Sequence, residues 1–186
     1  MALSGPVACG KTTLGKILIG EQPYEGCIKV GEQVLSAEGD SYDWRIGYMG
    51  HQPQLFSGTI EENICMGAAC SGGQLDVWDA LRLVCMDEEV RNFPDGINTY
   101  IGSEGMALSG GQQARIALAR TLYHKRHVMV LDDPFSALDS ETEVKIFKNL
   151  KEYASDCVVI LITHRQELFA QVDFVLWIEN GKVVEK

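Results

Sequence analysis

The feature that most constrains this chain is a glycine-rich loop at residues 5–12, with the sequence GPVACGKT. It matches the pattern G-x-x-x-x-G-K-[ST] at every fixed position, between an apolar strand end and a short helix. The glycines let the backbone fold into a cradle whose N–H groups face an anion. Lys11 then reaches a phosphate as a cation, and Thr12 offers its hydroxyl to Mg²⁺. The loop predicts phosphate binding by Gly5, Pro6, Val7, Ala8, Cys9, Gly10, Lys11, Thr12 and Thr13.

Length, composition and charge narrow the class of protein. The chain has 186 residues, of which 46% are hydrophobic, which suits one globular domain and excludes a disordered or collagen-like chain. No apolar stretch reaches the roughly 18 residues that span a bilayer, and we expect no secretory leader. The net charge of −10 argues against a broad nucleic-acid-binding face. The six cysteines show no C-x-x-C spacing, so we expect reduced thiols, with disulfides or a structural zinc as alternatives.

The second half of the chain alternates between apolar runs and helical patterns. Residues 128–131 and 158–162 are short apolar runs, typical of parallel strands buried on both faces. Residues 109–125 and 141–153 have the spacing of helices with one apolar side. Asn180-Gly181 separates two further strands and favours a tight hairpin turn. This alternation predicts an α/β fold with a mainly parallel central sheet.

Two helices are expected in the first half. Residues 11–19 follow the glycine-rich loop, and Gly20 is a suitable residue to end that helix. Residues 72–93 are predicted to be helical because apolar residues recur there at helical spacing. The members of this stripe are Leu75, Trp78, Leu81 and Cys85.

Asp132 follows the apolar run 128–131 and supplies a carboxylate at the end of a strand. Near a phosphate-binding loop, an acid at this position holds Mg²⁺ across from the loop's hydroxyl residue, here Thr12. An acid at a strand end can also be a simple helix cap. The loop favours the magnesium role.

The segment Leu108-Ser109-Gly110-Gly111-Gln112 decides among the nucleotide-binding classes that share such a loop. Ser109 and Gln112 have capping-box spacing, which predicts a helix N-terminus. The two glycines leave the backbone open to a bulky anion, and a purely structural cap would not need both. The segment resembles the signature motif of ATP-binding cassette (ABC) ATPases. The resemblance implies nucleotide binding by Ser109, Gly110, Gly111 and Gln112.

Further segments resemble ABC motifs in the same order along the chain. Gln52 is similar to the family's Q-loop glutamine, residues 136–139 to its D-loop and His164 to its switch histidine. Residues 56–64 and 101–105 resemble segments of exporter-type cassettes, although Tyr100 stands where exporters often carry an acid. The resemblance implies catalytic roles for Asp133, His164 and Gln52, and magnesium binding by Thr12, Gln52 and Asp132.

The resemblance also implies how the chain is organised. Residues 1–186 would be a single ABC ATP-binding domain, with an α/β P-loop NTPase core formed by residues 1–52 and 127–186. Residues 53–126 would form a helical subdomain that carries the signature. The family's antiparallel β subdomain would be incomplete, because only four residues precede the glycine-rich loop. We therefore expect an N-terminally truncated domain, and no residue is assigned to the aromatic that stacks on adenine in the family.

In function, the resemblance implies ATP and Mg²⁺ as cofactors and ATP-driven transport across a membrane. Two cassettes sandwich two ATP molecules in the family, so the expected partners are a second cassette and the transmembrane domain of a transporter. These partners would hold the chain at the cytoplasmic face of a membrane. Nucleic acid is not an expected partner, although a soluble ABC ATPase that acts on nucleic acid or ribosomes is an alternative.

Asp133 stands where the family has the glutamate that orients the attacking water. Its side chain is one methylene shorter, so its carboxylate lies about 1.5 Å back, one bond length of the usual order. Weak hydrolysis is therefore expected, and the chain resembles the degenerate half of a heterodimeric exporter. One alternative is a conservative replacement that keeps useful activity. Another is a regulatory half that binds ATP, scarcely hydrolyses it and completes the site of a partner.

Overall fold

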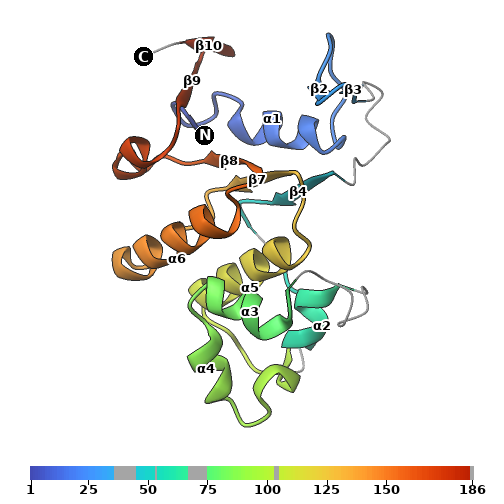
Figure 1. Ribbon diagram of the computed structural model, residues 1–186, viewed down its shortest axis with the longest axis vertical. Helices are drawn as coiled ribbons and strands as arrows, with labels where there is room; N and C mark the ends of the chain where they lie inside the picture. The colour runs from blue at the N-terminus through green and yellow to red at the C-terminus, as the bar shows by residue number, and fades with distance from the viewer. Residues whose placement is uncertain (36–44, 53, 67–74, 103–104, 185–186) are drawn as a thin grey trace. The chain divides into compact units, whose positions relative to one another are not determined.

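The computed structural model describes the chain except residues 36–44, 53, 67–74, 103–104 and 185–186 (Figure 1). The described residues fall into two compact units. The first is built by Met1–His51, Arg126–Asp133 and Cys157–Lys186, and the second by Gln52–Lys125 and Pro134–Asp156. The division into a core and a helical subdomain at residues 52 and 126 stays a prediction. Pro134–Asp156, which the prediction assigns to the core, clusters with the helices instead.

The first unit is organised around a six-stranded sheet with the strand order β10-β9-β1-β8-β7-β4. Every neighbouring pair is parallel except β9 and β10. The predicted α/β fold with a mainly parallel sheet is therefore confirmed (Figure 1). The strands are β1 Ala2–Ser4, β4 Ile46–Met49, β7 Val128–Asp132, β8 Val158–Ile162, β9 Val175–Glu179 and β10 Lys182–Val184. The unit also holds helix α1 Lys11–Leu18, the hairpin of β2 Lys29–Val30 and β3 Gln33–Val34, and the 3-10 helix η2 Gln166–Gln171.

Strands β7 and β8 differ in burial. All five residues of β7 are buried, as predicted, because β4 and β8 flank the strand. In β8 only Leu161 and Ile162 are buried, and Val158 is 52% exposed. The prediction that β8 is buried along its whole length is wrong. The short strand β1 pairs only with Leu161 and Ile162, so it flanks only the end of β8.

The predicted helix end and the predicted hairpin turn are both confirmed. Helix α1 ends at Leu18, and Gly20 follows in the left-handed region with φ 77°. In the β9–β10 hairpin, Asn180 and Gly181 have φ values of 49° and 72°. Positive φ at both central residues is what a tight two-residue turn between twisted strands requires.

The second unit is mainly helical. Its helices are α2 Ile60–Cys65, α3 Val77–Leu83, α4 Asp87–Arg91, α5 Gly110–Tyr123 and α6 Ser140–Tyr153, with the 3-10 helix η1 Gly96–Asn98. A two-stranded ladder joins β5 Gly58–Thr59 to β6 Tyr100–Ile101. Helix α5 packs against α2 and α3, and its residues Ile116, Leu118 and Leu122 are buried. The helices predicted over residues 109–125 and 141–153 are confirmed as α5 and α6.

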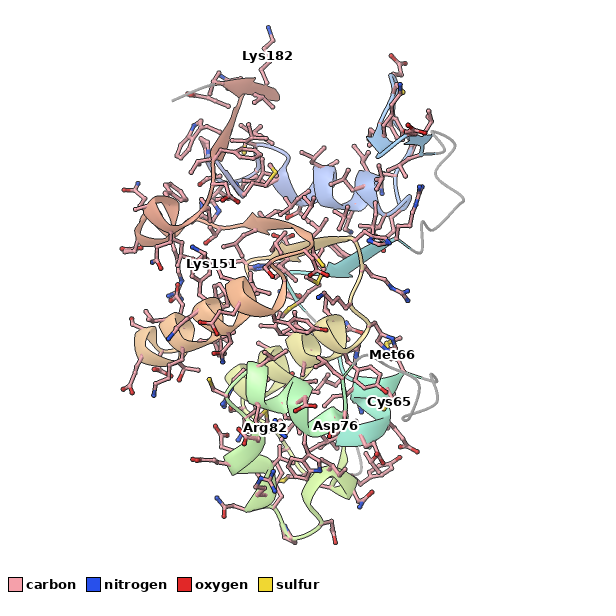
Figure 2. The ribbon with its side chains drawn as sticks, viewed as in Figure 1. Cys65, Met66, Asp76, Arg82, Lys151 and Lys182 are labelled. Atoms are coloured by element: carbon pink, nitrogen blue, oxygen red, sulfur yellow. The ribbon has the colours of Figure 1, made fainter. Side chains whose placement is uncertain are left out.

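The helix predicted over residues 72–93 is divided into α3 and α4, so that prediction is wrong in part. Asp76 caps α3 by accepting a hydrogen bond of 2.8 Å from the backbone N–H of Asp79, and Arg82 lies in the last turn (Figure 2). Cys85 then has φ 53°, a left-handed conformation that separates the two helices. Residues 72–74 lie outside the described residues.

Two further observations concern the cysteines and the length of the helices. The described cysteines, at positions 9, 27, 65, 85 and 157, are reduced thiols, and Cys70 lies outside the described residues. Across the described parts of the chain, no helix combines the length and the apolar character needed to cross a bilayer.

Candidate functional site

The glycine-rich loop connects β1 to α1, and backbone contacts dictate its shape. Gly5 has φ 148°, and a Cβ there would lie 2.1 Å from the carbonyl oxygen of Ile178, so only glycine fits. Ala8 and Gly10 are also left-handed, with φ values of 62° and 105°. Such alternation of left- and right-handed residues turns successive N–H groups toward one side and forms an anion-binding nest.

Lys11 lies inside this loop and is only 7% exposed. Its Nζ donates hydrogen bonds to the carbonyl oxygens of Gly5, at 3.0 Å, and Pro6, at 2.7 Å, and lies 3.5 Å from Cys9 Sγ. The loop's own carbonyl groups therefore hold the Lys11 ammonium group next to the place where the sequence predicts a bound phosphate.

Thr12 and Asp132 meet although 120 residues separate them in the sequence. The Thr12 hydroxyl donates a hydrogen bond of 2.7 Å to Asp132 Oδ2. Asp132 ends β7 and is 3% exposed. The structure thus places two hard oxygen groups side by side at the first turn of α1, as magnesium binding by these residues requires.

Tyr48 in β4 supports the same carboxylate, and the sequence analysis did not identify it. Burial, the negative charges of Asp132 and Glu21, and a hydrogen bond with Asp132 together raise the pKa of Tyr48 to about 12. The phenol therefore stays protonated beside Asp132. A polar residue inside the otherwise apolar strand 46–49 was the available signal.

A cavity of about 450 Å³ lies beside the loop, within the first unit. It brings together the predicted loop, the predicted magnesium ligands Thr12 and Asp132, and the predicted catalytic residues Asp133 and His164. Gln52 is exposed and belongs to the second unit, so its predicted role stays a prediction. The cavity is lined by Val7, Ala8, Cys9, Gly10, Lys11, Thr12, Thr13, His51, Asp132, Asp133, Ile162 and His164.

Asp133 is fixed by its backbone. It follows β7 with φ 50°, and its N–H donates a hydrogen bond of 2.8 Å to the carbonyl oxygen of Ile162 in β8. His51 Nδ1 lies 3.8 Å from Asp133 Oδ2. The sequence does not predict a role for His51, because a lone histidine carries no spacing signal.

The signature segment forms the N-terminus of α5 in the second unit, as predicted. Ser109 Oγ accepts a hydrogen bond of 3.2 Å from the N–H of Gln112, and Gln112 Oε1 accepts one of 2.9 Å from the N–H of Ser109. This reciprocal pair is the predicted capping box.

The two glycines of this segment differ in what surrounds them. A Cβ on Gly111 would lie 2.9 Å from the carbonyl oxygen of Ala137, so close packing alone requires glycine there. A Cβ on Gly110 would lie 3.9 Å from Ala137 Cβ, which is ordinary contact. Packing therefore requires glycine at Gly111 and not at Gly110, in agreement with the expectation that a purely structural cap would not need both glycines.

The geometry of loop, strand end and capped helix agrees with a comparison against known families. The sequence profile described as ABC transporter matches residues 1–136. This chain belongs to the ABC transporter family. A bacterial Atm1-family ABC exporter with ATP bound has a similar structure, with a TM-score of 0.87 and 30% identity over 99% of this chain and 32% of that one.

Curated ABC relatives align with the whole chain. ABC transporter B family member 29, chloroplastic, of Arabidopsis thaliana is 37% identical over 188 residues, which cover 100% of this chain and 30% of the relative. The glutathione/L-cysteine transport system ATP-binding/permease protein CydD of Haemophilus influenzae is 33% identical over 100% of this chain and 31% of its own length. The chain thus spans about 30% of the length of these ABC relatives.

A partly exposed network holds the ABC signature helix, and the sequence does not predict it. Gln112 Nε2 donates a hydrogen bond of 3.1 Å to Glu89 Oε2, and Arg115 forms an ion pair of 2.6 Å with Glu89 Oε1. Arg115 also donates to the carbonyl oxygen of Cys85. Burial raises the pKa of Glu89, but the hydrogen bonds from Arg115 and Gln112 outweigh it, so the pKa is lowered. Ser109 therefore holds the oxygen of the Gln112 side-chain amide, and Glu89 holds its nitrogen.

The site's groups fit a magnesium-bound triphosphate. The nest and Lys11 suit phosphate oxygens, and Thr12 and Asp132 provide the oxygen ligands that Mg²⁺ prefers. Within the described residues, no cluster of three or more His, Cys, Asp or Glu could hold a metal ion by itself.

Proposed function

We propose that this chain is the ATP-binding and ATP-hydrolysing cassette of an ABC exporter. The observation that carries the proposal is the single cavity that joins the loop, the buried Lys11, the Thr12–Asp132 pair and Asp133. Similarity to ATP-binding/permease proteins and to an exporter with ATP bound supports it.

In this proposal, the loop N–H groups and Lys11 bind the β- and γ-phosphates of ATP. Thr12 and Asp132, with Gln52 from the Q-loop segment, hold Mg²⁺, which neutralises charge on the phosphate oxygens when bound. Asp133 orients a water molecule toward the γ-phosphorus, and His164 donates hydrogen bonds near the same phosphate. The bond between the β–γ bridging oxygen and the γ-phosphorus breaks, giving ADP and inorganic phosphate.

The remaining parts of the function lie outside a single cassette. We infer that the N-terminus of α5, with Ser109 and Gly110, contacts the ATP held by a second cassette. Binding of two ATP molecules then favours the closed pair, and hydrolysis reopens it. A transmembrane domain would couple this cycle to transport and hold the cassette at the cytoplasmic side of a membrane.

A second candidate function is an ATP-binding half that hydrolyses poorly and completes the site of its partner. The short Asp133 side chain and the fully formed cap of α5 favour it. Single-turnover hydrolysis at the Asp133 site separates the two functions, because an ATPase converts its bound ATP and a regulatory half retains it.

Both candidate functions require Mg²⁺-dependent ATP binding at the loop, which isothermal titration calorimetry measures. Lys11→Ala removes a charge-assisted contact worth about 1.5–3 kcal/mol, so affinity should fall about 10- to 100-fold. Lys16→Ala is the matched control, because Lys16 lies in the same helix, forms an exposed ion pair with Glu21 and does not line the cavity. Equal affinity of the Lys11→Ala variant and the wild-type protein would contradict the proposed function.

A further inference from the structure

The strand register places His51 opposite Asp133. β4 and β7 run parallel, with Met49 opposite Leu131. Continued by two residues, this register brings position 51 opposite position 133. Adjacent strands lie about 4.8 Å apart, so the backbone alone makes these two residues neighbours at the end of the sheet.

The side chains confirm what the register indicates. His51 Nδ1 lies 3.8 Å from Asp133 Oδ2, within ion-pair range but longer than a hydrogen bond. Both side chains line the phosphate cavity. The His51 side chain is 55% exposed and that of Asp133 22%, so the imidazole lies on the open side of the carboxylate.

Asp133 needs such a neighbour because only its side chain is free to turn. Its backbone is held in the left-handed region and bonded to Ile162 of β8. A carboxylate that orients water must present one oxygen in a fixed direction, and a short side chain reaches the water from fewer rotamers. A donor on Oδ2 fixes the rotamer and leaves Oδ1 for the water.

We propose that His51 is a positioning residue for ATP hydrolysis, whose Nδ1–H holds Oδ2 of Asp133 while Oδ1 orients the attacking water. This inference rests on the proposed function of the cavity. It assigns to His51 a role in the rate of hydrolysis and none in the affinity for ATP.

The test compares turnover and binding in the intact protein assembled with its partner cassette. His51→Ala should lower kcat about 10-fold, because misplaced catalytic groups lose part of the rate that positioning supplies. KM and the Kd for a fluorescent ATP analogue should not change. His51→Asn should restore kcat, since its amide nitrogen takes the place of Nδ1. In the Asp133→Glu background the longer side chain reaches the water itself, so the loss caused by His51→Ala should shrink.

His127→Ala is the matched control, because His127 is an exposed histidine of the same unit that does not line the cavity. Unchanged kcat in His51→Ala would overturn the inference, as would an equal loss in the Asp133→Glu background. A weaker Kd with unchanged kcat would also overturn it, because His51 would then bind nucleotide directly. These results leave the proposed function intact. That function fails separately if Lys11→Ala binds ATP as tightly as the wild-type protein.

Discussion

The glycine-rich loop and the signature segment are both glycine-containing helix N-termini, but only the first is a complete site. At the loop, Lys11, Thr12 and Asp132 converge on one cavity within one unit. At the signature, Ser109 and Gln112 satisfy each other's N–H groups. Their helix end offers an uncrowded glycine, Gly110, and the cation beside it, Arg115, is already paired with Glu89 and with the carbonyl oxygen of Gly111. The glycine-rich loop can therefore hold a phosphate with its own groups, whereas the signature segment fits a ligand that another molecule holds.

The largest expected effect comes from breaking the loop. Gly5→Ala should lower the free energy of unfolding by about 3–5 kcal/mol, because a Cβ overlaps a backbone oxygen and the backbone is strained. Urea denaturation measures the loss. Gly26→Ala is the control, since Gly26 has φ 111° but nothing within 4 Å of a Cβ, and it should cost about 1–2 kcal/mol. Equal losses in the two variants would contradict the packing argument.

Alanine substitutions at the two signature glycines should separate the effect of packing on stability from the effect of ligand contact on turnover. Gly111→Ala should destabilise the protein by about 1–2 kcal/mol, because its Cβ crowds the carbonyl oxygen of Ala137. Gly110→Ala should leave the unfolding free energy unchanged or slightly higher, while turnover with a partner cassette falls. Thermal unfolding and ATPase assays on both variants check this, and an equal loss of stability would refute the distinction.

Tyr48→Phe tests how the complete site holds Asp132. Loss of the hydrogen bond should cost about 0.5–1.5 kcal/mol near neutral pH. Since folding raises the pKa of Tyr48 from 10.0 to about 12, its contribution to stability is full below pH 10 and is lost as the pH rises toward 12. Between these pH values, the free energy of unfolding should fall less steeply in the variant than in the wild-type protein. Parallel curves for variant and wild type would exclude this role.

The smallest effect concerns the support of the signature helix. Glu89→Gln should cost less than about 1 kcal/mol at neutral pH, because the ion pair with Arg115 is partly exposed. Folding lowers the pKa of Glu89 below its ordinary value of 4.5, so this stability is present above that pH. This contribution to stability is lost as the pH falls through the pKa that Glu89 has in the folded protein. The difference between variant and wild type, followed by urea denaturation, should therefore vanish in acid, and a difference that persists there would rule out the charge as its cause.

The sequence predicts those features that short-range patterns encode. The loop, the strand that ends in Asp132 and the Ser109–Gln112 cap are local, and the structure contains each of them. The break between α3 and α4 could not be predicted, because Cys85 is not a residue whose identity signals a left-handed backbone. The partial burial of β8 depends on the register of β1, a strand from the other end of the chain.

The missed site residues share a physical reason. Tyr48 lies beside Asp132, and His51 beside Asp133, only because β4 lies next to β7 in one particular register. Glu89 reaches Gln112 only through the packing of the second unit. Such long-range pairings leave no spacing signal along the chain, unlike the loop and the cap.

The most direct test of the central claim, that the loop holds this cassette's own ATP while the signature serves another, is a pair of measurements on Ser109→Arg. ATP affinity and turnover are measured in the intact protein with its partner cassette. The account predicts unchanged affinity for ATP at the loop of this chain and abolished hydrolysis at the partner's site, because an arginine covers the helix end that faces the partner's ATP. A loss of affinity like that of Lys11→Ala, or unchanged turnover, would contradict it.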